Sequence, residues 1–164
     1  MLPVCVRTCG AGVFFDTGSV YMKGVKDLIL DDSPKGVKKI EKLLAKDPGS
    51  AAYFEELKAE TGRATAMEFP KIRMMVTDSF VCASRLGFPG ALIIVPIVQI
   101  RNIYRTNVIR NNYDFDNFTL AVETDAGLKF MASFPRTGAK SLDFFNEVID
   151  AVKSRMALNG GAQI

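Results

Sequence analysis

The clearest alternation of apolar and polar positions lies in residues 117–135, NFTLAVETDAGLKFMASFP. In the first half of this segment one parity is apolar and holds Phe118, Leu120 and Val122. A second alternating run, residues 128–134, follows Asp125-Ala126-Gly127. A period of two is typical of a strand with one buried face, and glycine accepts the positive φ of a tight turn. The segment therefore predicts a β-hairpin.

Apolar positions spaced three and four apart predict helices in the first part of the chain. Ser33 can cap a helix over residues 34–46, and Pro34 suits its first position. Ser50 is expected to cap a second helix over residues 51–61, which Gly62 ends. Residues 19–30 also have helical spacing, which Gly24 weakens.

The middle of the chain changes character, because residues 66–134 are rich in β-branched and aromatic side chains divided by turn signals. The expected strands cover residues 66–76, 80–85, 91–95, 97–109, 117–123 and 128–134, and the run 97–109 is either one strand or a broken one. A final helix over residues 138–157 carries a broad apolar stripe. The order indicates an α+β protein, in which N-terminal helices precede a small antiparallel β-barrel that the C-terminal helix closes.

Four segments of this region resemble a known superfold. They are VTDSFVCAS (76–84), LIIVPIVQIRNIYRT (92–106), FTLAVETDAGLKFMASF (118–134) and SLDFFNEVIDAV (141–152). Together they resemble bacterial PH-like and GRAM-like domains of the pleckstrin-homology superfold. The resemblance implies a PH-like domain over residues 66–157, an N-terminal helical segment over residues 1–65 and a flexible tail over residues 158–164.

The resemblance also implies a binding module rather than an enzyme. Many such domains bind phosphoinositide headgroups through a basic loop between their first two strands. We expect the corresponding turn at Thr77-Asp78-Ser79, which is short and acidic and departs from that pattern. The helices of residues 33–62 are not part of the usual domain, so they either pack on the barrel or form a partner-binding arm.

Composition excludes several kinds of chemistry. The 164 residues contain no histidine, so Ser-His-Asp and Cys-His catalysis and histidine-rich metal sites are excluded, and no cofactor is expected. The odd set Cys5, Cys9 and Cys82 is no disulfide framework and favours a reducing cytoplasm. No apolar window is long enough to span a membrane.

Charge is distributed unevenly around a formal net charge of only +3. Residues 70–110 are mostly basic and residues 111–150 are mostly acidic. The first stretch forms either a basic strand surface that meets phosphate or anionic lipid, or one half of a set of cross-strand ion pairs. The candidate binding residues are Lys71, Arg73, Arg101, Arg105 and Arg110.

These features predict a cytoplasmic, non-enzymatic adaptor or scaffold, whose partner is another protein or a second copy of the chain. The alternative is peripheral attachment to anionic membrane lipid through the five candidate residues. The near-neutral charge argues against nucleic acid. Arg136 and Lys140 stand at the start of the last helix, where they form either an ordinary helix entry or a further anion site, because helix N-termini attract anions.

Overall fold

The computed structural model describes residues 24–85, 90–136 and 140–159. Its first elements are four helices, α2 (Val25–Leu30), α3 (Pro34–Ala45), α4 (Pro48–Ala51) and α5 (Phe54–Thr61). The Ser33 hydroxyl accepts a hydrogen bond from Gly36 N–H at 3.1 Å, which confirms the predicted cap of α3. Of the helix expected over residues 19–30, only residues 24–30 lie within the described chain, and α2 covers 25–30.

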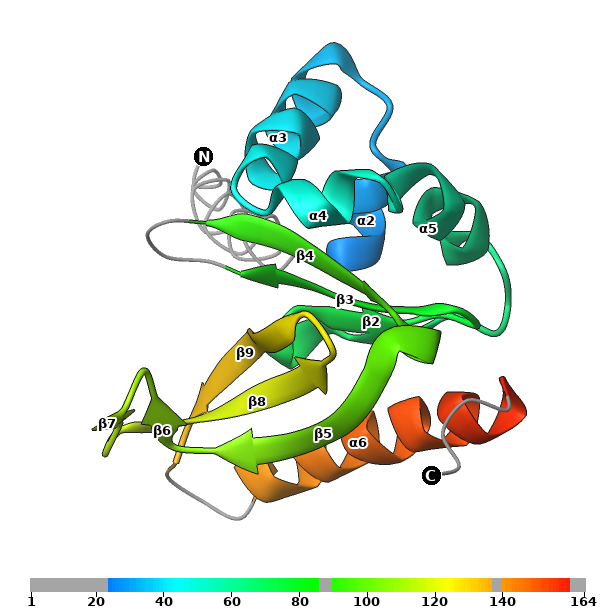
Figure 1. Cartoon of the computed structure of the whole chain (residues 1–164). Helices are drawn as coiled ribbons and strands as arrows, with labels where there is room; N and C mark the ends of the chain where they lie inside the picture. Colours follow the sequence, from blue (N-terminus) through cyan, green and yellow to red (C-terminus); the bar gives the residue numbers. More distant parts are fainter. Residues whose placement is uncertain (1–23, 86–89, 137–139, 160–164) are drawn as a thin grey trace, which may run out of the picture.

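The first sheet, called sheet A here, is a four-stranded antiparallel meander in the order β1-β2-β3-β4 (Figure 1). Its strands are β1 (Met67–Phe69), β2 (Met74–Val76), β3 (Phe80–Arg85) and β4 (Ala91–Pro96). The single strand predicted over residues 66–76 is wrong in its middle, where the 3-10 turn η1 (Pro70–Ile72) intervenes. Pro70 fits the start of such a turn because it has no N–H to offer a ladder, and Arg73 then leaves it with a left-handed φ of 55°.

The second sheet, sheet B, has the order β5-β8-β9. Its strands are β5 (Ile100–Thr106), β8 (Asn117–Thr124) and β9 (Gly127–Pro135). The predicted hairpin of residues 117–135 is confirmed, with Gly127 at a φ of 134°. The run predicted over residues 97–109 is broken into the 3-10 turn η2 (Ile97–Gln99), β5 and β6 (Val108–Ile109), and β6 pairs with β7 (Asn112–Tyr113) in a small separate hairpin.

A β-bulge changes which side chains of β9 face the core. Leu120 pairs with Ala132, but the next residue, Ala121, pairs with Phe130, so Met131 is the extra residue. Met131 and Ala132 are both buried in the core between the sheets, whereas Phe130 shares the opposite face with Ala121. The uninterrupted alternation predicted for residues 128–134 is therefore wrong.

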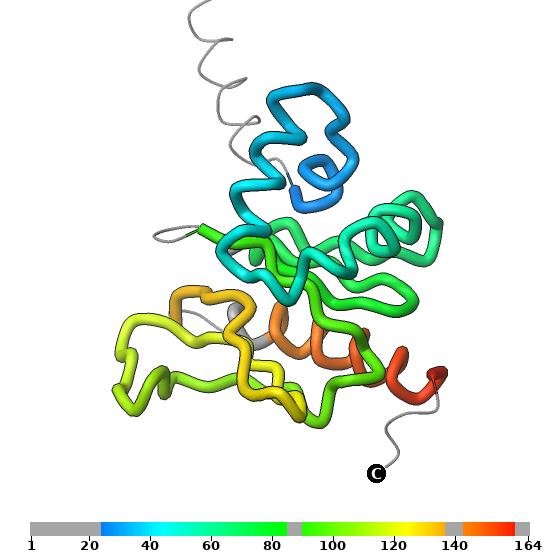
Figure 2. The backbone as a smooth tube through the Cα atoms, turned by 45° about the horizontal axis from the view of Figure 1, so that its top comes forward, coloured from blue at the N-terminus to red at the C-terminus, as the bar shows by residue number. Residues whose placement is uncertain are grey.

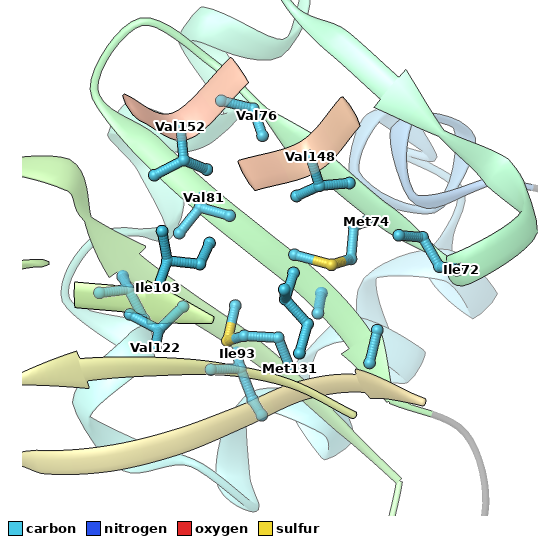
Figure 3. Packing of buried hydrophobic residues seen from close by; sticks show 14 of the residues in the cluster. Ile72, Met74, Val76, Val81, Ile93, Ile103, Val122, Met131, Val148 and Val152 are labelled. Carbon is cyan, nitrogen blue, oxygen red and sulfur yellow. The ribbon is translucent and has the colours of Figure 1, made fainter. Parts of the chain in front are cut away.

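Sheet A is buried on both faces along β2, β4 and residues 80–84 of β3. Its inner face, which includes Met74, Val81 and Ile93, packs against sheet B (Figure 3). The residues between them, including Met75, Cys82 and Ile94, face outward and pack against α2, α3 and α5. The N-terminal helices therefore pack on the sheet, as the first of their two expected roles requires. Figure 2 shows these blue-to-teal helices above the green strands.

The last helix, α6 (Lys140–Leu158), closes the side opposite those helices. It lies against β2, β5 and η2, and it buries Phe145, Val148 and Val152 completely. The sheets do not close into the predicted barrel, because no ladder joins sheet A to sheet B within the described ranges. At one seam β9 lies against β3 and η1, and a 3-10 turn cannot supply a strand ladder there.

Ser50 has a different role from the predicted helix cap. It is fully buried within α4, and its hydroxyl accepts a hydrogen bond from Ile94 N–H of β4 at 2.8 Å. Asp47 accepts from the same hydroxyl and forms an ion pair with Lys129 of β9 at 3.0 Å. Sequence spacing missed this bond because Ile94 lies 44 residues away. The contact satisfies an amide on the outer edge of β4, and leaving such a buried amide unpaired costs about 1–3 kcal/mol.

Candidate binding surfaces

Two of the predicted cations line one pocket, called the phosphate pocket below after the phosphate groups that the sequence predicts as partners of the basic stretch. It has a volume of about 260 Å³ and is lined by Lys71, Ile72, Arg73, Ser84, Met131, Ala132 and Ser133. Arg73 Nε donates to the Ser84 carbonyl at 3.3 Å, and Ser84 N–H donates to the Arg73 carbonyl at 3.0 Å. The guanidinium of Arg73 is half-buried, and burial lowers its pKa from the usual value. Both the backbone and the side chain of Arg73 are thus tied to β3.

The strand boundaries show that one prediction, the position of the connection between the first two strands, is wrong. The first two strands are joined by Pro70–Arg73, whereas Thr77-Asp78-Ser79 joins β2 to β3. This second turn is held by Glu60 of α5, whose carboxylate accepts from Thr77 Oγ1 at 2.7 Å and from Ser79 N–H at 2.9 Å. The connection between the first two strands is therefore basic, not acidic. Sequence reasoning missed this because it merged β1, η1 and β2 into one strand.

A second basic group surrounds Phe118 at the start of β8. The guanidinium carbon of Arg105 lies 4.6 Å from the centroid of the Phe118 ring, and that of Arg136 lies 5.0 Å from it. Arg136 Nη1 also donates to the Phe115 carbonyl at 3.1 Å. Phe118 pairs with Phe134 of β9, and Arg136 follows the last residue of that strand. We call Arg105, Phe118 and Arg136 the Phe118 cluster. Ser133, the last β9 residue that lines the phosphate pocket, is followed directly by Phe134, the strand partner of Phe118.

The remaining candidates lie apart from each other. Arg101 forms a two-pronged ion pair with Asp125, with both N–O distances 2.8 Å, at the β8–β9 turn. The bond from Arg101 lowers the pKa of Asp125, as the cross-strand interpretation expects. Arg110 is exposed at the turn of the β6–β7 hairpin, with a φ of 52°. Both ends of sheet B thus carry candidate cations, and the charge of Arg101 is paired with the Asp125 carboxylate.

The edge strands of the two sheets are unequally covered. The outer edge of β4 bonds to Ser50, β1 has only three residues, and β9 lies against β3 and η1. β5 is seven residues long and pairs with β8 on one side, and no other described strand pairs with it. Its side chains Arg101, Asn102 and Arg105 are exposed. An uncovered edge offers backbone N–H and C=O groups to a further strand.

The described residues offer little reactive chemistry. Burial raises the pKa of the Cys82 thiol, which keeps it protonated. Asp114 accepts from Asp116 N–H and Asn117 N–H, and these bonds lower its pKa. Across the described ranges, no group of three or more Cys, Asp or Glu side chains is placed to hold a metal ion. Nor does any helix there have both the length and the apolar character needed to cross a bilayer.

Comparison with known proteins adds no identity to this geometry. No protein-family model matches the chain, and neither a curated protein nor a solved structure does.

Proposed function

We propose that the chain is a non-enzymatic adaptor with a PH-like architecture that binds an extended segment of a partner protein. The order of the elements supports the architecture: a four-stranded antiparallel meander, a second antiparallel sheet and then one amphipathic helix. The corner between the sheets at η2 and the position of α6 against β2 and β5 support it further.

The observation that carries the proposal is that, of the described strands, β8 alone pairs with β5, which leaves the other edge of β5 without a strand partner. A partner segment that pairs with β5 gains main-chain hydrogen bonds, as in other cases of strand addition. The exposed side chains of Arg101 and Arg105 would favour acidic residues in that segment. Because the other sheet edges are short or covered, β5 is the edge where a fourth strand of sheet B can form.

Hydrogen exchange tests this role with a peptide selected from a display library against the whole chain. We expect bound peptide to slow amide exchange within residues 100–106, because new main-chain bonds protect amides, while β1–β4 are unchanged. A salt series should weaken binding if acidic peptide residues meet Arg101 and Arg105. Protection confined to another surface, such as the groove between α3 and α5, would contradict the role of β5.

A second candidate function is binding of a phosphate group in the phosphate pocket. A basic connection between the first two strands, two cationic side chains and the hydroxyls of Ser84 and Ser133 support it. Cations and hydroxyl donors are the groups that bind phosphate oxygens. The phosphate belongs either to a lipid headgroup or to a soluble phosphate compound.

Replacing Lys71 by alanine tests the phosphate pocket. We expect the substitution to weaken binding about fivefold, because one cation at an anionic surface contributes about 1 kcal/mol. Binding is measured by calorimetry with pyrophosphate and by co-sedimentation with vesicles that contain phosphatidylserine, which separates the two sources. The matched control is Arg101→Ala, which also removes one cation but lies at the start of β5, outside the pocket lining. It should leave the affinities for pyrophosphate and for the vesicles unchanged. Equal losses in the two variants would mean that only the total charge matters.

A further inference from the structure

The β6–β7 hairpin and the two residues that follow it include large exposed apolar side chains. Tyr113 is 66% exposed and Phe115 is 75% exposed, and their rings stack with centroids 6.0 Å apart. Val108 of β6 is exposed as well. We call residues 108–115 the aromatic hairpin; it projects beyond the strands of sheet B (Figure 1). Neighbouring exposed aromatic rings are unusual unless a surface interacts with something apolar.

The shape of the aromatic hairpin is fixed by polar contacts. Arg110 and Asn111 have φ values of 52° and 68°, the consecutive left-handed pair that a tight two-residue hairpin turn requires. At its base, Asp114 N–H donates to the Asn107 carbonyl at 2.7 Å. The Asp114 carboxylate accepts from the amides two and three residues further on, those of Asp116 and Asn117. The rings are thus presented by an ordered turn, so little conformational freedom is lost when they are covered.

Cations lie at both ends of this apolar surface. Arg110 is at its tip, and Arg105 and Arg136 flank Phe118 at its base. The nearby carboxylates are Asp114 and Asp116, and the charge of Asp114 is stabilised by backbone N–H groups. Aromatic rings between cations match the boundary of an anionic bilayer, where rings settle at headgroup level and arginines meet lipid phosphates. Binding of a protein partner to the rings would not require cations at both the tip and the base of the aromatic hairpin.

We propose that the aromatic hairpin contacts an anionic bilayer, with Tyr113 and Phe115 entering the headgroup region and Arg110, Arg105 and Arg136 meeting lipid phosphates. The inference rests on the second candidate function in its lipid form and names side chains outside the phosphate pocket that perform it. It does not depend on peptide binding at β5. Because the hairpin and the pocket share no side chain, vesicle binding without a response of the hairpin would distinguish failure of the inference from failure of the second function.

The absence of tryptophan from the chain permits a direct test. The variant Phe115→Trp carries a single fluorescent reporter in the aromatic hairpin. Vesicles with phosphatidylserine should shift its emission to shorter wavelength, lipids brominated near the headgroup should quench it, and salt should weaken both effects. The control Val98→Trp places the reporter at a 65% exposed site on η2, at the other end of β5, and should not respond.

A pair of deletion variants measures the contribution of the rings. Tyr113→Ser with Phe115→Ser should weaken vesicle partitioning on the order of tenfold, because two apolar surfaces no longer leave water. The control pair Val98→Ser with Leu128→Ser removes exposed apolar side chains elsewhere and should have no effect. Thermal unfolding should be unchanged in both pairs, because all four side chains are exposed.

Three outcomes would overturn the inference. If the wild-type chain binds vesicles but the Phe115→Trp reporter stays silent, the hairpin is not the contact and the phosphate pocket stands alone. If the wild-type chain binds no anionic vesicles, the lipid form of the second function fails together with the inference. If the reporter emission shifts with protein concentration in the absence of lipid, a second copy of the chain covers the hairpin.

Discussion

Replacing Phe145 by alanine is expected to lower the free energy of unfolding by about 3–5 kcal/mol. Phe145 is completely buried in the core between the two sheets and α6. Its removal takes away apolar contacts and leaves a cavity that the surrounding strands fill only in part. Denaturant unfolding followed by circular dichroism gives the change, with unchanged slope as the check on two-state behaviour.

The matched control is Phe115→Ala, the same substitution at a 75% exposed site. It should change the free energy of unfolding by less than about 0.5 kcal/mol. Equal effects of the two substitutions would show that α6 is not seated on the sheets as described. The comparison also matters for function, because α6 is one of the elements that contact β5.

Replacing Leu57 by alanine is expected to cost about 2–5 kcal/mol and to destabilise helices and strands together. Leu57 of α5 is fully buried in the cluster that also holds Met75, Cys82 and Leu92 on the outer face of sheet A. Loss of that cover exposes apolar strand residues to water, so the helices and the sheet should unfold in one transition. Circular dichroism and hydrogen exchange within residues 80–96 should report the same midpoint.

Leu30→Ala is the control for this substitution, because Leu30 of α2 is exposed. It should leave the midpoint almost unchanged. If the helices unfold at a lower denaturant concentration while the amides of β3 and β4 stay protected from exchange, the helices and the sheet do not form one cooperative unit.

The sequence predicted the elements whose signals are local. Ser33 and Pro34 define the start of α3, and Gly127 defines the turn of the β8–β9 hairpin. The period of the last helix placed Phe145, Val148 and Val152 on one buried face. Caps, turns and periodic apolar stripes need only neighbouring residues, which is why they could be recognised.

Features set by distant contacts could not be predicted in the same way. The bulge at Met131 reverses the faces of β9, because both Met131 and Ala132 fit the core while Phe130 packs elsewhere. Ser50 looked like a helix cap, but its hydroxyl serves an amide of β4. Burial on both faces also makes β4 an unbroken apolar run, so its alternation gives no sign of which residues face the helices.

The candidate site was predicted in part. Lys71 and Arg73 do meet, but only because η1 interrupts a run that looked like one strand. Arg101 carries an ion pair that no charge count could assign to it. Arg136 precedes the last helix in the sequence, but its guanidinium lies over the ring of Phe118 together with that of Arg105. The open edge of β5 depends on which strands lie beside it, so sequence order alone does not reveal it.

The double burial of sheet A has a consequence for synthesis on the ribosome. Chains emerge from the N-terminus, so α2–α5 are made before the strands whose outer face they cover. When Met75, Cys82 and Ile94 emerge, the helices that they pack against have therefore already been made. The inner face has no such advantage, because Phe145 and Val152 are made last. The nascent chain is thus most exposed to aggregation in the interval between the completion of β4 and the arrival of α6.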